Sequence, residues 1–210
     1  MAIIWPFSGS VQNYAQGGSD IVVPRPDCPT CSLPMVFWSS YKRYVRHLAE
    51  DHHLTIKRAR CIGCSTTHAL IPSFILLNRL DTVDTVGKVL ENVLAGTTGV
   101  RPAAIEVAVP HTTARGWIRP FCGRILEIGA CFSALLVELG GEVISYVDNY
   151  KKYALSSIEK AFQSATKLPG WQSIGMWNFV STITGGKIIA TNTNSPFLRV
   201  GKRYFIYPVP

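Results

Sequence analysis

Two Cys-x-x-Cys pairs constrain the fold of this 210-residue chain more than any other feature. They are Cys28-Pro29-Thr30-Cys31 and Cys61-Ile62-Gly63-Cys64. Each pair can turn so that its two sulfurs point the same way, and two such turns complete a tetrahedral site with Zn–S distances of about 2.3 Å. Pro29 stiffens the first turn, and we expect Gly63 to take a positive φ in the second. The spacing predicts a zinc ribbon that holds structural Zn2+ through Cys28, Cys31, Cys61 and Cys64.

Other uses of these cysteines fit the sequence less well. Two disulfides need an oxidising compartment, whereas the first residues contain no basic leader and no long apolar region, so we expect a reducing cytoplasm. A redox pair of the thioredoxin kind needs one Cys-x-x-Cys beside a βαβ pattern. Four sulfurs also leave no open position for catalysis. His52, His53 and His68 could replace one sulfur, but we expect them at the surface or around the ligands.

The charge of the chain favours a polyanionic partner. The net charge is +8, and the basic residues are concentrated before residue 81 and after residue 159. The hydrophobic fraction of 47% and the charged fraction of 16% are typical of a folded protein. The uncharged stretch Ile128–Val137 is too short to cross a bilayer, which needs about 20 residues.

The predicted ribbon is basic and contains interleaved aromatic residues. Met35–Trp38 and Leu54–Arg60 have the composition of strands, and the second of them contains Lys57, Arg58 and Arg60. These three side chains could lie along a nucleic-acid backbone. They could equally form a solvated face around a small metal core, and charge patterning does not separate the two.

Residues 83–126 follow the order of a helix-turn-helix. Apolar residues recur at helical spacing from Val83 to Leu94, and Gly96 ends that helix. Pro102 suits the first position of a short helix that reaches Val107. After a turn at Val109-Pro110, we expect a third helix capped by Thr112 or Thr113.

The third helix is the candidate for reading DNA. In a helix-turn-helix its N-terminal residues face the bases in the major groove, whereas Trp117 and Ile118 should pack inward. Ala108 occupies a region where such turns often have Gly, and Pro120 should end or kink the helix early. The alternative is an ordinary core helix with exposed arginines. The candidate contacts to double-stranded DNA are Thr112, Thr113, Arg115, Gly116 and Arg119.

Three further helices are expected in the second half. Apolar stripes predict helices over residues 125–139 and 149–167, interrupted at Gly140-Gly141 and ended by Leu168-Pro169-Gly170. An apolar aromatic segment near Met176–Val180 predicts another, which breaks at Gly185-Gly186 and packs in the core. The basic, aromatic tail Arg199–Phe205 is either a nucleic-acid arm or a last strand.

These residues resemble an uncharacterised bacterial family in which a zinc ribbon precedes a helix-turn-helix, often associated with mobile elements. The layout is also similar to the N-terminal region of some insertion-sequence transposases. The resemblance implies DNA binding without catalytic activity, and a recombinase or transposase as a partner. The matching stretches, between about residues 28 and 196, are Cys28–Cys31, Arg58–Cys64, Thr67–Phe74, Thr113–Trp117, Trp177–Phe179 and Thr184–Gly186.

No catalytic constellation is evident in the sequence. A transposase needs three dispersed carboxylates for two metal ions, but Glu138, Glu142, Asp148 and Glu159 lie close together and no acid follows Glu159. Cys122 and Cys131 lie in apolar helical segments, where a buried thiol is the usual outcome. We therefore expect a protein that is not an enzyme.

The sequence as a whole predicts a mainly α protein with a small β zinc ribbon. The expected parts are a loose lead-in (1–26), the zinc ribbon (27–78), the helix-turn-helix (79–126) and a C-terminal helical region with a basic tail (127–210). We expect a zinc-dependent, sequence-specific DNA-binding protein of a mobile element or its regulation. The alternative is a protein-interaction or RNA-binding ribbon module of a larger assembly. In either case the ribbon, with little core of its own, should unfold without zinc.

Overall fold

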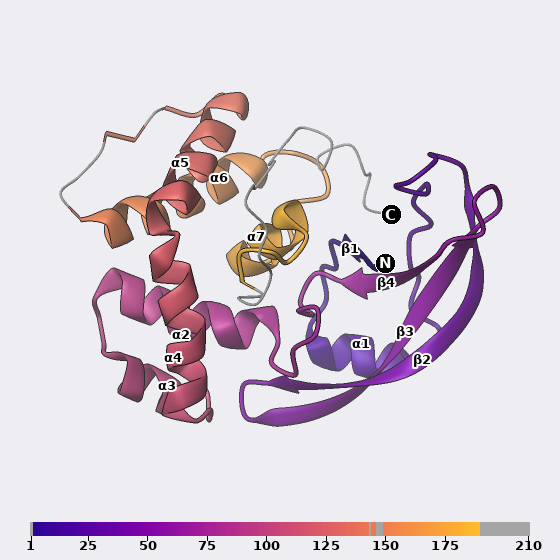
Figure 1. The fold of residues 1–210 in the computed structure, drawn as a ribbon, viewed down its shortest axis with the longest axis horizontal. Coiled ribbons are helices and arrows are strands. Elements are labelled where there is room, and N and C mark those ends of the chain that lie inside the picture. Colours follow the sequence, from indigo (N-terminus) through magenta and orange to yellow (C-terminus); the bar gives the residue numbers. More distant parts are fainter. Residues whose placement is uncertain (1, 143, 146–148, 190–210) are drawn as a thin grey trace.

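A curved four-stranded sheet lies beside a group of helices (Figure 1). The computed structural model describes residues 2–142, 144–145 and 149–189. Within these ranges it contains seven helices and four strands, so the fold is mixed α/β, with a larger sheet than the sequence predicted. The strands are β1 (Ala2–Trp5), β2 (Met35–His47), β3 (Glu50–Cys61) and β4 (Thr67–Pro72), in the spatial order β1-β4-β3-β2.

The long hairpin of β2 and β3 dominates the sheet. The two strands are antiparallel from Met35↔Cys61 to His47↔Glu50, and only Leu48 and Ala49 connect them. The strands predicted at Met35–Trp38 and Leu54–Arg60 are confirmed, but both are parts of longer elements. The register shifts between Phe37 and Ser39, which is a β-bulge on the outer strand.

Residues 1–26 were wrongly predicted to be a loose lead-in. β1 pairs in parallel with β4, and α1 (Val11–Gly17) packs against β3. Ser10 begins α1 by accepting a hydrogen bond from the Asn13 backbone N–H. Trp5 and Tyr14 are buried in the core of the sheet. The partner strand of β1 is distant in sequence and β1 has only four residues, so no local pattern reveals it.

The helices follow the predicted order closely. The cap at Thr82, the left-handed Gly96 after α2, the cap at Asn149 and the left-handed Gly185 after α7 set their ends. The predicted interruption at Gly140 is also confirmed, since this residue has a φ of +76°. The helices are α2 (Val83–Ala95), α3 (Val100–Glu106), α4 (His111–Gly123), α5 (Ile125–Glu138), α6 (Tyr150–Ala165) and α7 (Met176–Thr184).

The aromatic segment of α7 belongs to the helical core, as the sequence predicted. Trp177 and Phe179 are buried, and a Cβ at Gly87 of α2 would lie only 2.3 Å from Trp177 Cγ. Asn178 Nδ2 donates a hydrogen bond to Asp84 Oδ1 at 3.0 Å. These contacts give the Trp177–Phe179 stretch a structural role in fastening α7 to α2.

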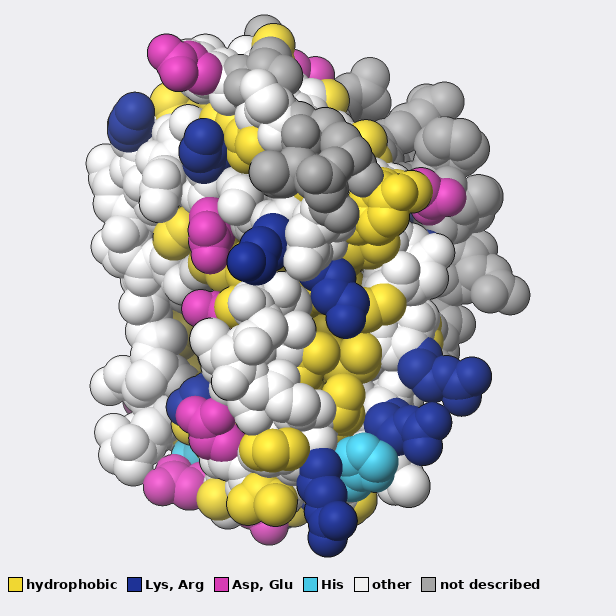
Figure 2. Space-filling view, turned by 90° about the vertical axis from the view of Figure 1, so that its left-hand side faces the viewer, with side chains coloured by type: hydrophobic (Ala, Val, Ile, Leu, Met, Phe, Trp, Pro, Cys, Tyr) yellow, Lys and Arg dark blue, Asp and Glu magenta, His cyan; other side chains and the backbone are white. Residues whose placement is uncertain are grey.

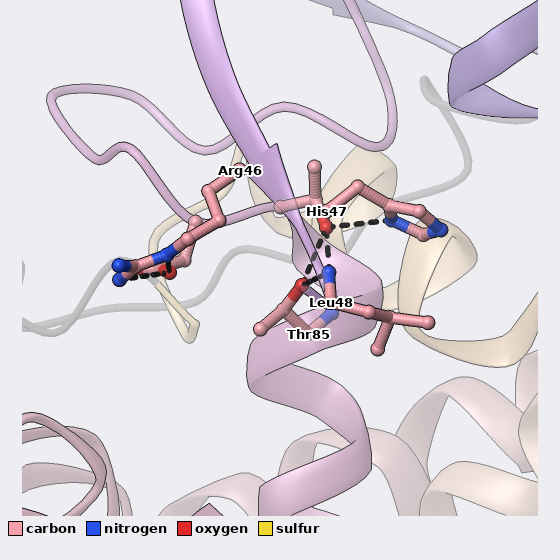
Figure 3. Close-up of polar contacts among 6 residues, drawn as sticks. Arg46, His47, Leu48 and Thr85 are labelled. Atoms are coloured by element: carbon pink, nitrogen blue, oxygen red, sulfur yellow. Dashed lines mark hydrogen bonds and ion pairs between the residues drawn. The ribbon is translucent and has the colours of Figure 1, made fainter. Parts of the chain in front are cut away.

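The turn of the hairpin is joined to the start of α2 (Figure 3). The Leu48 backbone N–H donates to Thr85 Oγ1 at 2.8 Å, and His47 Nδ1 lies 3.0 Å from Thr82 Oγ1. Arg46 forms an ion pair with Asp81 at 2.6 Å. These contacts place one end of the hairpin on the helices and leave its other end, which contains the cysteines, remote from them (Figure 1).

The tail Arg199–Phe205 and the acid Asp148 lie outside the described residues. Within those residues, no single helix has the length and apolar character needed to cross a membrane. Helices α4 and α5 meet this criterion only as a pair, and they are bent by 65° at their junction.

Candidate metal centre and nucleic-acid interface

The four predicted cysteine ligands converge at one end of the sheet. Cys28 and Cys31 come from the loop before β2, Cys61 ends β3, and Cys64 follows in the loop to β4. The four sulfurs all lie within 4.8 Å of one another. The Sγ atoms of Cys31 and Cys61 are 3.3 Å apart, and those of Cys28 and Cys64 are 3.6 Å apart. These separations exceed a disulfide bond of about 2.05 Å, so the thiols are free.

The arrangement fits zinc. A tetrahedron with Zn–S distances of about 2.3 Å has S–S edges of about 3.8 Å, close to the two observed separations. Four thiolate donors favour zinc over magnesium or calcium, which prefer oxygen. Across the part of the chain that the structure describes, no other group of three or more Cys, His, Asp or Glu side chains is arranged to hold a metal. The cluster can therefore bind Zn2+ with no open position for catalysis.

The two cysteine turns have the same backbone geometry, but Gly63 does not provide it. The residue after each pair takes the left-handed conformation, Ser32 with a φ of +58° and Ser65 with a φ of +60°. Gly63 is not among the residues with positive φ, so that prediction was wrong. Its lack of a side chain serves packing instead, since a Cβ there would lie 2.3 Å from Leu33 Cδ1.

Replacing Ser65 with Gly should stabilise the protein. A left-handed conformation costs a residue other than Gly about 1–2 kcal/mol, and Gly relieves this cost. The greater backbone freedom of Gly in the unfolded chain offsets about half of that stabilisation. We expect Ser65→Gly to raise the free energy of unfolding by about 0.5–1 kcal/mol, measured by denaturant unfolding of the zinc-loaded protein. The matched control is Ser40→Gly within β2, which should lower it by a similar amount. Equal effects of the two substitutions would contradict this account.

Two polar side chains lie beside the sulfurs. His68, buried in β4, places Nε2 3.7 Å from Cys28 Sγ, and burial lowers the pKa of His68, which favours the neutral ring. Thr66 Oγ1 lies 3.2 Å from Cys64 Sγ, and hydrogen bonds from the Thr66 side chain and backbone lower the pKa of Cys64 to about 6. Groups of this kind orient metal ligands and favour the thiolate form. His68 is thus near the ligands, as expected, while His52 and His53 lie far along β3.

The other two cysteines lie away from this centre. Cys122 and Cys131 are half-buried in α4 and α5, and burial raises the pKa of both thiols. A raised pKa leaves less thiolate, which is the nucleophilic and metal-binding form.

Helices α2, α3 and α4 pack on one another in the predicted order, with three details that differ. α3 begins at Val100, so Pro102 is its third residue. α4 begins at His111 after Pro110, so Thr112 and Thr113 lie inside its first turn and do not cap it. Pro120 does not end α4, which continues to Gly123. Ala108, at the turn, has a φ of +54°, the conformation for which many such turns use Gly.

The side chains of α4 divide into a buried and an exposed set. Ala114, Trp117 and Ile118 are buried, as the sequence predicted for the last two. Thr113 is half-buried, so of the candidate contacts it is the least accessible. The other four candidates, Thr112, Arg115, Gly116 and Arg119, are exposed. On the face of the molecule formed by the helices, Lys and Arg side chains gather towards one lower edge, beside a histidine (Figure 2).

The predicted basic residues of β3 lie at the cysteine end, apart from α4. Lys57 Nζ donates to the Ile21 carbonyl at 2.8 Å and lies over the Phe37 ring, so it already has partners in the fold. Arg58 is exposed, and Arg60 lies over the Trp38 ring. The structure therefore separates the candidate nucleic-acid contacts into two surfaces, one on α4 and one on the hairpin.

The comparison with protein families gives a match that contains the whole metal centre and the first part of α4. Residues 28–115 match the model of a domain of unknown function (DUF6431). The match begins at the first cysteine ligand and ends in α4 at Arg115. No curated protein and no solved structure matches the chain. None of these comparisons links the chain to transposases or mobile elements.

Proposed function

We propose that the protein is a zinc-stabilised, sequence-specific binder of double-stranded DNA that inserts α4 into the major groove. The observation that carries this proposal is the outward face of α4. It exposes Thr112, Arg115, Gly116 and Arg119 together, with Trp117 on the opposite, buried side. Arginine can pair with guanine through two hydrogen bonds, and a hydroxyl can contact either kind of base pair. The two arginines form no ion pair with any residue that the structure describes.

The local charge supports an anionic partner for α4. Residues 107–126 contain three arginines and no acid. The first turn of α4 has neither an acidic residue nor a side-chain cap. The Thr113 N–H donates to the Pro110 carbonyl, which leaves the N–H groups of His111 and Thr112 for a phosphate. Contacts of this kind position a protein on DNA, while the side chains that follow read the bases.

Gly116 also supports α4 as the element that contacts DNA. A glycine inside a helix costs about 1 kcal/mol relative to alanine. Nothing among the described residues lies within 4 Å of where its Cβ would be, so packing does not explain it. Its position on the face of Arg115 and Arg119 allows the backbone of α4 to approach a DNA surface closely.

The proposal includes a protein partner that performs the reaction and assigns no reaction to the chain itself. A DNA-binding protein of a mobile element would act with a recombinase or transposase that supplies the chemistry. The alternative, a ribbon module that binds protein or RNA, predicts no affinity for duplexes at α4.

Substituting Gly116 tests the proposal against a purely structural role. We expect Gly116→Ala to stabilise the protein by about 1 kcal/mol and to weaken duplex binding about tenfold. Gly123→Ala is the matched control, because Gly123 is also exposed in α4 with open space at its Cβ but lies two turns from Gly116, at the C-terminal end of the helix and away from the residues proposed to face the bases. It should change duplex affinity little. Fluorescence anisotropy of labelled duplexes gives the affinities, and equal duplex affinities for the two variants would remove the argument from Gly116.

A further inference from the structure

Two large aromatic side chains are exposed at the cysteine end of β2. Phe37 is 45% exposed and Trp38 is 59% exposed, although Met35, two residues before Phe37, is buried. The other tryptophans, Trp5, Trp117, Trp171 and Trp177, are all buried. β2 is the outer strand of the sheet, so both rings border its free edge. The register places Phe37 on the face of Ala59 and Lys57, whereas Trp38 lies with Arg60 and Arg58 on the opposite face of the sheet. Trp38, Arg58 and Arg60 are called here the Trp38 surface.

Each ring has a cation beside it. Arg60 Cζ lies 4.9 Å from the centroid of the Trp38 ring. Lys57 Nζ and Arg25 Cζ lie 5.4 Å and 5.5 Å from the centroid of the Phe37 ring. A cation over one face of a ring holds the ring in place by the attraction between charge and π electrons. The exposure of both rings leaves further ring surface open to a flat partner.

The surroundings of the two rings favour an anionic partner. Residues 25–80 contain eight Lys and Arg and three acids, Asp27, Glu50 and Asp51. Glu50 and Asp51 lie beside the hairpin turn, which at about 3.3 Å per residue is some 30 Å along β2 from the two rings. Arg58, close to Arg60 on β3, is exposed.

The backbone at this place is poorly suited to pairing with another strand. The β-bulge between Phe37 and Ser39 disturbs the regular spacing of N–H and C=O groups along the outer edge. Bulges of this kind discourage the addition of a further strand. Recognition through side chains is therefore favoured over strand addition by a protein partner.

We propose that the Trp38 surface binds single-stranded nucleic acid by stacking an unpaired base on the Trp38 ring. Arg58 and Arg60, on the same face of β3, would lie along its phosphates. Every base has a flat π face, so stacking requires unpaired bases but no particular sequence. The bases of a duplex are already stacked on one another, so this surface would select strands that α4 does not read. The inference is independent of the proposed function of α4, from which this surface is separate.

The fluorescence of Trp38 gives a direct test in the zinc-loaded, full-length protein. Because Trp38 is the exposed tryptophan, stacking of a base on it should quench the emission from exposed indole while the buried tryptophans change little. Short oligothymidylate and oligouridylate are the probes, and a duplex of equal length is the comparison. Stronger quenching of Trp38 by either single strand than by the duplex supports the proposal, and the difference between the two strands reports whether the 2′-hydroxyl is read.

Three variants separate stacking from folding. Trp38→Ala should weaken oligothymidylate binding by about 5- to 150-fold, as for other stacking aromatics. Trp38→Phe should keep most of the affinity measured by anisotropy but lose the fluorescence change. Tyr150→Ala, which removes a ring of comparable exposure from α6, should leave the affinity unchanged. Zinc content and circular dichroism check that each variant is folded.

Three results would overturn the inference. The first is equal quenching of Trp38 by single strands and by the duplex. The second is unchanged single-strand affinity in Trp38→Ala. The third is loss of self-association in Trp38→Ala without any oligonucleotide binding by the wild type, because the surface would then join two copies of this chain. None of these results bears on α4, whose duplex binding is measured separately with Gly116→Ala.

Discussion

Removing zinc will open the cysteine end of the sheet and leave the helices folded. Structural zinc contributes about 10–16 kcal/mol of apparent binding free energy in zinc-finger peptides, so loss of the ion removes the main link between the loops at 28–34 and 61–66. From the sequence we expected the whole ribbon to unfold, because a ribbon alone has little core. The structure changes that expectation, since Trp5, Tyr14, Phe74 and Ile71, none of them a metal ligand, give the sheet a larger apolar core than a ribbon alone would have.

Chelation followed by limited proteolysis measures this result. New cleavage should appear in the two cysteine loops, while the helical circular dichroism signal stays close to that of the zinc-loaded protein. Cys61→Ser should reproduce the effect without a chelator. Cys131→Ser is the matched control, because Cys131 is a half-buried thiol of α5 outside the cluster. A Cys61→Ser protein with wild-type zinc content and unchanged protection of both loops would contradict the metal centre.

Replacing Arg115 and Arg119 with alanine will weaken duplex binding with little effect on stability. A side chain that pairs with a base contributes about 1–3 kcal/mol of discrimination, so each substitution should lower affinity for the preferred site by about 5- to 150-fold. Both side chains are exposed, so the free energy of unfolding should change by less than about 0.5 kcal/mol.

The pattern of loss distinguishes base contacts from general charge effects. Lys160→Ala, which removes one exposed positive charge from α6, is the control and should alter duplex binding only slightly. If Arg115 reads a base, its loss should weaken the preferred sequence more than unrelated ones. If it contacts only phosphate, affinity should fall equally for all sequences and the dependence on salt should decrease by about one ion. Wild-type affinity in the double variant would exclude α4 as the duplex contact.

Features encoded by short spacings could be predicted from the sequence. The two Cys-x-x-Cys pairs predicted the sulfur cluster, because each turn places its own two sulfurs and both lie beside strands of one hairpin. The apolar stripe from Val83 to Leu94 and the glycine at 96 predicted α2 to within its caps. Trp177 and Phe179 were correctly assigned to the core, because large apolar side chains at helical spacing have few other uses.

Features that depend on distant partners could not be predicted. β1 pairs with β4, and α1 packs on β3, so neither is encoded in residues 1–26 alone. The predicted cap of α4 at Thr112 or Thr113 was wrong, because Pro110, with a φ of −58°, is the residue before the helix, which begins at His111. At Pro120 the helix continues despite the missing N–H, since the buried Ile118 and Phe121 hold that turn in the core. Ser32 and Ser65 had a signal that was overlooked, their shared position directly after a cysteine pair.

Selection from random duplexes is the measurement that tests the central claim most directly. The zinc-loaded, full-length protein is mixed with a library of random double-stranded DNA at near-physiological salt, and the bound fraction is sequenced over successive rounds. The account predicts that one motif is enriched and that Arg115→Ala relaxes part of it while the zinc content stays the same. Enrichment of no motif by a folded, zinc-loaded protein, with binding that follows only the concentration of salt, would contradict it.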